Sequence, residues 1–212
     1  MVKAGRSPDR IASDAWRACA NGDERVKPAV QSLRNLAALP RCAIVAMGVS
    51  GCGKSTLIEH LAAHLDCPAF EGDDFHAAAS IAKMRAGQPL DDSDRWPWLD
   101  RLGAAIGAAA IDNGVALAAC SALKRSYRER LERAAGVPLL FVLLDGEREE
   151  IADRLAARSG HYMPPSLLGS QFAALERPGP DERALVLHCY RPVEQLCAEV
   201  LAWARVGIGT AR

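Results

Sequence analysis

The chain has 212 residues, of which half are hydrophobic and a quarter are charged, and its 26 basic residues balance its 26 acidic ones. This composition is typical of one folded domain with a sizeable core, and it excludes a disordered or collagen-like chain. The chain has no net charge, and its longest apolar runs fall far short of the ~20 residues of a membrane span. The sequence therefore predicts no nucleic acid and no membrane among its partners.

The cysteines and the N-terminal region bear on the cellular compartment. Seven cysteines, an odd number without any C-x-x-C pair, argue against a disulfide framework and against a zinc site. The N-terminus lacks the apolar segment of a signal peptide, so we expect a cytoplasmic protein. Residues 1–40 contain no strand-like run and are predicted to be an N-terminal extension, flexible or docked on the surface, without chemistry of its own.

Residues 41–212 are interpreted as one domain, because short apolar runs alternate there with amphipathic helical patterns. The predicted strands cover residues 42–47, 68–70, 115–120, 139–144 and 184–187. Strands that are apolar on both sides and alternate with helices indicate a parallel sheet covered on both faces. The predicted fold class is α/β, a three-layer sandwich around a five-stranded parallel sheet.

Residues 48–55 match the phosphate-binding pattern G-x-x-x-x-G-K-[ST], between the first strand and an amphipathic helix. Glycines let successive backbone N–H groups turn toward a phosphate chain, and the helix N-terminus adds partial positive charge. Lys54 is predicted to contact the β- and γ-phosphates as a catalytic residue, and Ser55 to ligate Mg²⁺. The predicted nucleotide-binding residues of this loop are Gly48, Ser50, Gly51, Cys52, Gly53, Lys54, Ser55 and Thr56. The position of Cys52 beside Lys54 and a helix start predicts a lowered thiol pKa.

The rest of the chain narrows the class of nucleotide-binding protein. The guanine-reading motif N-K-x-D does not occur, which favours ATP, and the chain after the loop is too short for a motor ATPase. Two classes of protein remain as candidates, a compact small-molecule kinase and a nucleotide switch.

Glu71 and Asp73 follow the second predicted strand, at the edge where open α/β sheets bind ligands. They alternate along the chain and so face the same way. A kinase needs a carboxylate that orients the acceptor hydroxyl and takes its proton, and often another that holds Mg²⁺. We predict Asp73 as the catalytic base and Glu71 as a metal-site residue; a solvated acidic turn is the alternative.

Several segments, in order and at compatible spacing, resemble the bacterial-type gluconokinases, which belong to the shikimate/adenylate-kinase-like branch of P-loop kinases. These segments are residues 47–55, 71–76, 81–84, 87–90, 92–99, 120–128, 161–164 and 170–172. The resemblance implies a P-loop NTPase fold and transfer of the γ-phosphate of ATP to the 6-hydroxyl of D-gluconate, usually in a homodimer. Two departures, Ala77 in place of a frequent proline and Ser80 in place of asparagine, leave the local binding geometry open.

A gluconate site needs a cation for the carboxylate and short polar groups for the hydroxyls. The substrate-binding residues implied by the resemblance are Asp73, His76, Lys83, Arg95, Lys124 and Arg128. Arg95 and Lys124 lie within dense matches, but the sequence does not decide which cation binds the carboxylate.

Residues 147–157 form a predicted helix, and Arg154 and Arg158, four residues apart, project from one face of it. By resemblance, Arg154 stacks on the adenine and Arg158 contacts the transferring phosphoryl group as a catalytic residue. The glycines and prolines that follow predict a mobile lid, approximately residues 158–178, that excludes water. Tyr190, after the last predicted strand, is predicted to border the adenine.

Two other functions remain open on the same scaffold. One is a P-loop kinase for another small acid or polyol, of which shikimate is an example. The other is a non-catalytic nucleotide-binding regulator, which would bind ATP without any sugar-dependent release of ADP.

Overall fold

The computed structural model describes residues 41–157 and 168–207. The predicted N-terminal extension, Arg158 and the first part of the predicted lid lie outside the described residues.

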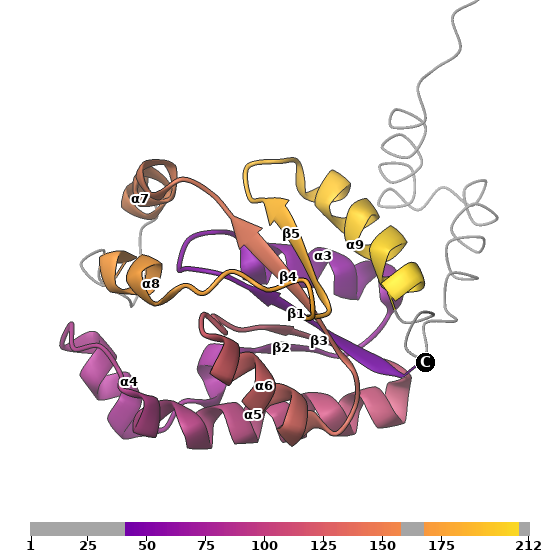
Figure 1. Cartoon of the computed structure of the whole chain (residues 1–212), viewed down its shortest axis with the longest axis horizontal. Helices are drawn as coiled ribbons and strands as arrows, with labels where there is room; N and C mark the ends of the chain where they lie inside the picture. Colours follow the sequence, from indigo (N-terminus) through magenta and orange to yellow (C-terminus); the bar gives the residue numbers. More distant parts are fainter. Residues whose placement is uncertain (1–40, 158–167, 208–212) are drawn as a thin grey trace, which may run out of the picture. The chain divides into compact units, whose positions relative to one another are not determined.

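One parallel sheet of five strands organises the described residues, in the order β2-β3-β1-β4-β5 (Figure 1). The strands are β1 (Cys42–Met47), β2 (Ala69–Glu71), β3 (Val115–Ala119), β4 (Leu139–Asp145) and β5 (Ala184–His188). All four strand pairs are parallel, so every strand ends at the same edge of the sheet. The predicted α/β class and the five predicted strands are confirmed, each strand boundary to within one residue.

Helices connect the strands and flank the sheet. They are α3 (Lys54–Leu65), α4 (Ala78–Arg85), α5 (Asp92–Asn113), α6 (Arg125–Ala135), α7 (Arg148–Ala157), α8 (Leu168–Ala174) and α9 (Val193–Gly207), with a 3₁₀ turn, η2 (Gly72–Phe75). Figure 1 shows α4, α7 and α8 grouped at the left, where the strands end.

The side chains of β1 alternate between two apolar clusters. Ile44 and Ala46 belong to a cluster with α3 and α9, whereas Val45 and Met47 belong to a cluster with α5 and α6. Because successive strand residues point to opposite faces, this alternation places one helical layer on each side of the sheet. All six residues of β1 are buried, which explains why its sequence is apolar throughout.

Two glycines bring α5 and α6 into close contact. A Cβ atom at Gly103 would lie 2.6 Å from the Cβ of Ala134, and one at Gly107 only 2.0 Å from the carbonyl oxygen of Ala135. Both distances are shorter than any atom pair tolerates, so only glycine permits this packing. The contact fixes α6, and with it the loop that leads from β3 into α6.

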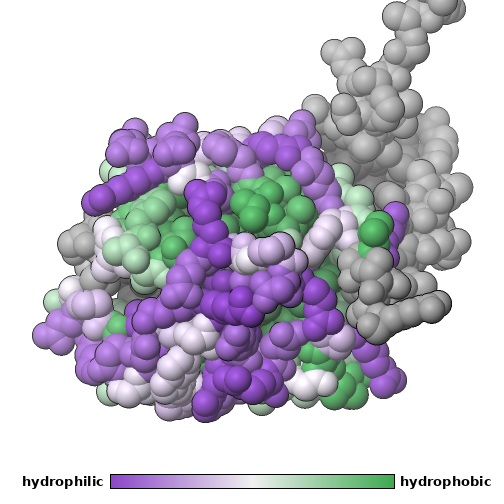
Figure 2. Space-filling view, viewed as in Figure 1, coloured by the Kyte–Doolittle hydropathy of each residue, from purple (hydrophilic) through white to green (hydrophobic). Residues whose placement is uncertain are grey.

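The two edge strands depart from the expectation that every strand is covered on both faces, because Ala69 in β2 is exposed and Val186 in β5 is 48 % exposed. Figure 2 shows hydrophobic residues over β5 in this view and hydrophilic ones over α5 and α6. Within the described ranges, no helix is long and apolar enough to cross a membrane.

Candidate active site

The loop between β1 and α3 has the backbone of a phosphate cradle. Gly48, Gly51 and Gly53 adopt φ angles of +133°, +87° and +98°, a region that other residues rarely occupy. A Cβ atom at Gly48 would also lie 2.7 Å from the carbonyl oxygen of Leu144 in β4. Helix α3 begins at Lys54, directly after the last glycine, so its N-terminus points into the loop.

Lys54 and Ser55 both lie on the wall of the cleft beside this loop. The Lys54 Nζ donates a hydrogen bond of 2.9 Å to the carbonyl oxygen of Val49. The Ser55 hydroxyl donates one of 2.6 Å to the Glu71 carboxylate. Burial is the main cause of a raised pKa at Glu71, the negative charge of Asp73 adds to it, and the Ser55 hydrogen bond offsets part of it.

The Ser55–Glu71 pair fits a Mg²⁺ ion. Hydroxyl and carboxylate oxygens are the donors that Mg²⁺ prefers, and proteins hold it with one or two carboxylates together with substrate phosphates. In the described ranges, no group of three or more His, Cys, Asp or Glu residues forms a metal site by itself. Protein oxygens and nucleotide phosphates would therefore have to share the ion.

One cleft contains both the phosphate loop and the predicted catalytic carboxylate. Its wall includes Ser50, Gly51, Gly53, Lys54, Ser55, Thr56, Glu71, Asp73, His76, Arg95, Ser121, Tyr127 and Gln171. A second cavity shares Arg95 and Gln171 with the first and adds Asp92 and Lys124. The structure thus brings the glycine loop and Asp73 to a common space, as in-line transfer from a bound nucleotide to a second substrate requires.

Helix α5 holds the segment that carries Asp73. The Trp98 indole N–H donates a 2.6 Å hydrogen bond to the carbonyl oxygen of Gly72, and the Arg101 guanidinium donates to the carbonyl oxygen of Phe75. The His76 ring stacks on Trp98 with a centroid distance of 4.1 Å. Burial, together with the charges of Arg95 and Arg101, lowers the pKa of His76 to about 4.

His76 is therefore a neutral side chain near pH 7. Its Nδ1 is buried without a hydrogen-bond partner, and a lone pair costs less there than an unpaired N–H, which favours the proton on Nε2. In this form His76 can donate a hydrogen bond to a hydroxyl but cannot balance a carboxylate charge.

At the first departure from the family pattern, the backbone has angles that a proline could also adopt. Ala77 has φ −68° and ψ 151°, close to the φ angle that a proline ring imposes, and His76 is extended as a residue before proline would be. Ser80, the second departure, is buried in α4.

Among the predicted cations, Arg95 and Lys124 reach the cavities. The Arg95 guanidinium donates to the carbonyl oxygen of Leu90 at 2.5 Å and lies 5.4 Å from the centre of the Tyr127 ring. The Lys124 ammonium forms a 2.9 Å ion pair with Asp92, which also accepts a hydrogen bond from the Tyr127 hydroxyl. Arg95 contributes to both cavities, whereas Lys124 lines only the second.

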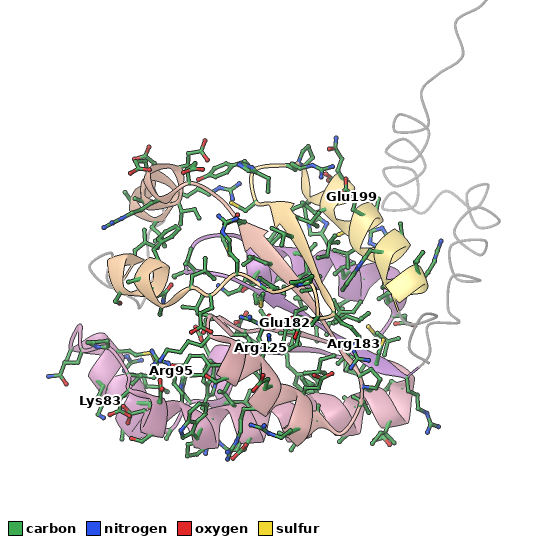
Figure 3. The ribbon with its side chains drawn as sticks, in the orientation of Figure 1. Lys83, Arg95, Arg125, Glu182, Arg183 and Glu199 are labelled. Atoms are coloured by element: carbon green, nitrogen blue, oxygen red, sulfur yellow. The ribbon has the colours of Figure 1, made fainter. Side chains whose placement is uncertain are left out.

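Lys83 and Arg128 are not brought to either cavity wall. Lys83 pairs with Asp94 at 2.8 Å, and Figure 3 shows it on the outer side of α4 and α5, further from the strands than Arg95. The Arg128 side chain is 1 % exposed and forms an ion pair with Glu182 at 2.5 Å. Its guanidinium also donates to the carbonyl oxygens of residues 122, 123 and 176. These contacts tie the buried guanidinium to the loop before α6, so Arg128 stays a predicted substrate residue that lies on neither cavity wall.

Sequence reasoning missed the contributions of Ala122, Tyr127 and Gln171. Ala122 has φ +41°, an unusual conformation for a residue with a Cβ, in the loop that lines the cleft, and Arg128 donates to its carbonyl oxygen. Gln171 accepts a hydrogen bond from the backbone N–H of Ser50. The motifs around Tyr127 and Gln171 resemble the family, but only the tertiary contacts relate them to the cleft.

Arg154 lies beside the phosphate loop. One of its guanidinium nitrogens would be 4.0 Å from a Cβ atom placed at Gly53, and the guanidinium stacks on the Tyr190 ring at 4.5 Å. The same group donates to the carbonyl oxygen of Cys189. The structure thus brings Arg154 and Tyr190 together next to the loop.

The expectation of a lowered thiol pKa at Cys52 is wrong. Burial raises this pKa, and the opposing charge of Lys54 is a smaller effect. The side chain is fully buried beneath the loop, so Cys52 contributes its backbone rather than a reactive thiolate.

Known proteins share both the sequence and the fold. The family model described as "AAA domain" matches residues 44–178. The gluconokinase of Gluconobacter oxydans (strain 621H) is 50 % identical over 143 residues, which cover 66 % of this chain and 78 % of the relative. A solved gluconokinase from Sinorhizobium meliloti 1021 is 41 % identical with a TM-score of 0.64, covering 80 % of this chain and 92 % of that one.

A solved sugar kinase from Janibacter sp. HTCC2649 is similar too, with 42 % identity and a TM-score of 0.73 over 82 % of this chain and 99 % of that one. These relationships cover most of the described residues and include the phosphate loop, Glu71 and Asp73. They confirm the P-loop fold and the family that the motifs indicated. The chain belongs to the gluconokinase family of P-loop kinases.

Proposed function

We propose that the protein transfers the γ-phosphate of ATP to the 6-hydroxyl of D-gluconate, giving 6-phospho-D-gluconate and ADP. The observation that carries this proposal is the single cleft shared by the phosphate loop and Asp73, in a chain of the gluconokinase family. Family membership favours this reaction over a shikimate-like kinase or a non-catalytic regulator.

On the donor side, backbone N–H groups of the loop 48–55 and the N-terminus of α3 bind the phosphates, apart from the N–H groups of Gly48 and Ser50, which donate to Ser121 and Gln171 within the fold. Lys54 balances the charge that develops on the transferring phosphoryl group. Ser55 and Glu71 would hold Mg²⁺, which supplies further charge neutralisation when bound. Arg154 and Tyr190 border the adenine, and Arg158, outside the described residues, is proposed to reach the γ-phosphate.

On the acceptor side, Asp73 accepts the proton of the attacking hydroxyl while the bond between phosphorus and the bridging oxygen of ATP breaks. Asp73 is exposed on the cleft wall, where it can reach a substrate, and the hydrogen bond from Trp98 to Gly72 fixes the backbone that carries it. Neutral His76 donates a hydrogen bond to a sugar hydroxyl.

Arg95 is the proposed partner of the gluconate carboxylate. It lines both cavities, and a guanidinium can bind a carboxylate with two parallel hydrogen bonds. Lys124 lies 2.9 Å from the Asp92 carboxylate, closer than the 3.9 Å between Arg95 and the same group, and it lines only the second cavity, so we assign it to a substrate hydroxyl at the rim.

The family resemblance also supports a homodimer, and the odd number of cysteines without C-x-x-C pairs supports a cytoplasmic location. Size-exclusion chromatography with light scattering would test the dimer directly.

A coupled ADP-release assay with Mg²⁺ and ATP tests the proposed reaction across a panel of sugar acids, with shikimate included. We expect rapid release with D-gluconate and little with shikimate. Product analysis should identify a phosphate ester at C6. ATP binding without any acceptor-dependent ADP release would refute the proposal in favour of a regulator.

A further inference from the structure

A side chain of helix α8 is hydrogen-bonded to the phosphate loop. The Oε1 atom of Gln171 accepts a 2.6 Å hydrogen bond from the backbone N–H of Ser50, 121 residues earlier in the chain. Leu168, at the start of α8, is buried in the cluster that contains α3 and α9. A side chain from outside the loop thus binds a backbone group within it.

The segment after α8 is attached to the acceptor side of the cleft. The Glu176 N–H donates to the carbonyl oxygen of Leu123 at 2.9 Å, and its carboxylate accepts from the backbone N–H of Arg125 at 2.7 Å. Arg128 donates to the carbonyl oxygen of Glu176 and pairs with Glu182. Figure 3 shows Arg125 and Glu182 close together near the start of α6. Since Leu123 lines both cavities, this second attachment reaches the same cleft as the first.

The two attachments place Gln171 between donor and acceptor. Gln171 lines the cavity that holds the phosphate loop and Asp73, and it also lines the cavity that holds Lys124. Here the two possible attackers of the terminal phosphorus, a sugar hydroxyl and water, compete. In both reactions the bond between the terminal phosphorus and the bridging oxygen of ATP breaks, and ADP leaves. The new bond to phosphorus forms either to the sugar oxygen, whose proton passes to Asp73, or to the water oxygen, whose proton passes to solvent.

We propose that Gln171 is a positioning residue that directs the phosphoryl group to the sugar rather than to water. Its hydrogen bond to Ser50 holds α8 as the wall shared by the two cavities, and this wall excludes water from the terminal phosphate. The inference rests on the proposed function, because it requires ATP and a sugar acid in the same cleft.

The experiment measures how the full-length protein partitions ATP between the two attackers. Inorganic phosphate and 6-phosphogluconate are quantified in the same reaction with saturating gluconate, and ATP affinity is measured separately by calorimetry. In Gln171→Ala, we expect the share of ATP lost to water to rise about tenfold and the transfer rate to fall by about 10- to 100-fold, because the wall is no longer held in place. ATP affinity should change by less than about threefold, since the bond to Ser50 does not itself hold the nucleotide.

Two further variants separate positioning from a general structural effect. Gln171→Glu keeps an acceptor oxygen at the same reach, so its partition should stay near that of the wild type, while its negative charge weakens ATP binding. Gln171→Asn is one methylene shorter and should behave like the alanine variant. Gln195→Ala in α9, outside both cavity walls, is the matched control.

An unchanged partition in Gln171→Ala would overturn the inference, as would equal partitions in the Asn and Glu variants if the alanine variant fails to fold. Tighter ATP binding with faster transfer would overturn it too, because Gln171 would then compete with the nucleotide for Ser50. A wild-type protein without gluconate-dependent ADP release would refute the proposed function instead.

Discussion

The donor and acceptor sides of the cleft are built in different ways. The donor side is one contiguous loop, residues 48–55, whose binding groups are mainly backbone N–H groups and a helix N-terminus. The acceptor side combines side chains from η2, α5, the loop before α6 and α8. A backbone site follows from local glycine spacing, whereas a side-chain site depends on which neighbours each charge meets. The positions of Lys54 and Ser55 on the cleft wall could therefore be predicted residue by residue, whereas the positions of Lys83 and Arg128 away from both cavity walls could not.

The largest expected effect is at Asp73, where both sides meet. Asp73→Asn removes the proposed proton acceptor and should lower turnover by roughly 10²- to 10⁴-fold. ATP binding should be unchanged, because the donor side does not use this carboxylate. Steady-state kinetics and calorimetry measure the two effects, with Asp74→Asn as the control, since Asp74 is not on the cavity wall. Near-normal turnover in the Asp73 variant would remove it from the role of base.

The next effect distinguishes the cations of the acceptor side. Arg95→Gln should raise the KM for gluconate by roughly 10- to 100-fold, the range expected when a hydrogen bond to a charged group is lost, with a smaller change in kcat. Lys83→Gln should change the KM by less than about twofold, because Lys83 lies on neither cavity wall and pairs with Asp94. The opposite ranking of the two variants would assign the carboxylate to Lys83.

A smaller effect concerns the pH dependence of stability. His76 has a pKa of about 4 in the fold, against 6.5 when unperturbed, so between these values the unfolded chain binds a proton that the folded chain does not. The free energy of unfolding should therefore fall as the pH decreases from 6.5 to 4, by about 1–2 kcal/mol after allowance for partial exposure.

His76→Phe, which keeps a ring against Trp98, should remove this contribution. Urea unfolding at pH 7.5 and pH 4.5 measures the difference for both proteins. If both lose the same stability between these pH values, His76 is not the group responsible.

The smallest effect is a gain in stability at Ala77. Its φ of −68° already suits proline, so Ala77→Pro should restrict the unfolded chain and add about 0.4–1 kcal/mol to the free energy of unfolding. The kinetics with gluconate should be unaltered, because the backbone before α4 would not move. A loss of stability or a raised KM would show that the departure from the family pattern has changed the local geometry.

Most of the fold could be predicted because its signals are local. Buried parallel strands are apolar throughout, and the glycine loop with its helix marks the edge where ligands bind. No local pattern in the sequence indicated that Val186 in the edge strand β5 would be exposed or that Ala122 would have a positive φ. Each feature depends on neighbours that are distant in sequence.

The amino-acid sequence by itself determined the phosphate loop, the two carboxylates after the second strand and the family, because each is a short pattern whose chemistry is contained in neighbouring residues. Only the tertiary structure decided which cations face the cleft. It also showed that Arg128 is bound by Glu182 and three backbone carbonyl groups, and that Gln171 accepts a hydrogen bond from Ser50. The physical reason is that the partners of a charged or polar side chain come from elsewhere in the chain, and these partners decide where the side chain lies and whether it faces the cleft.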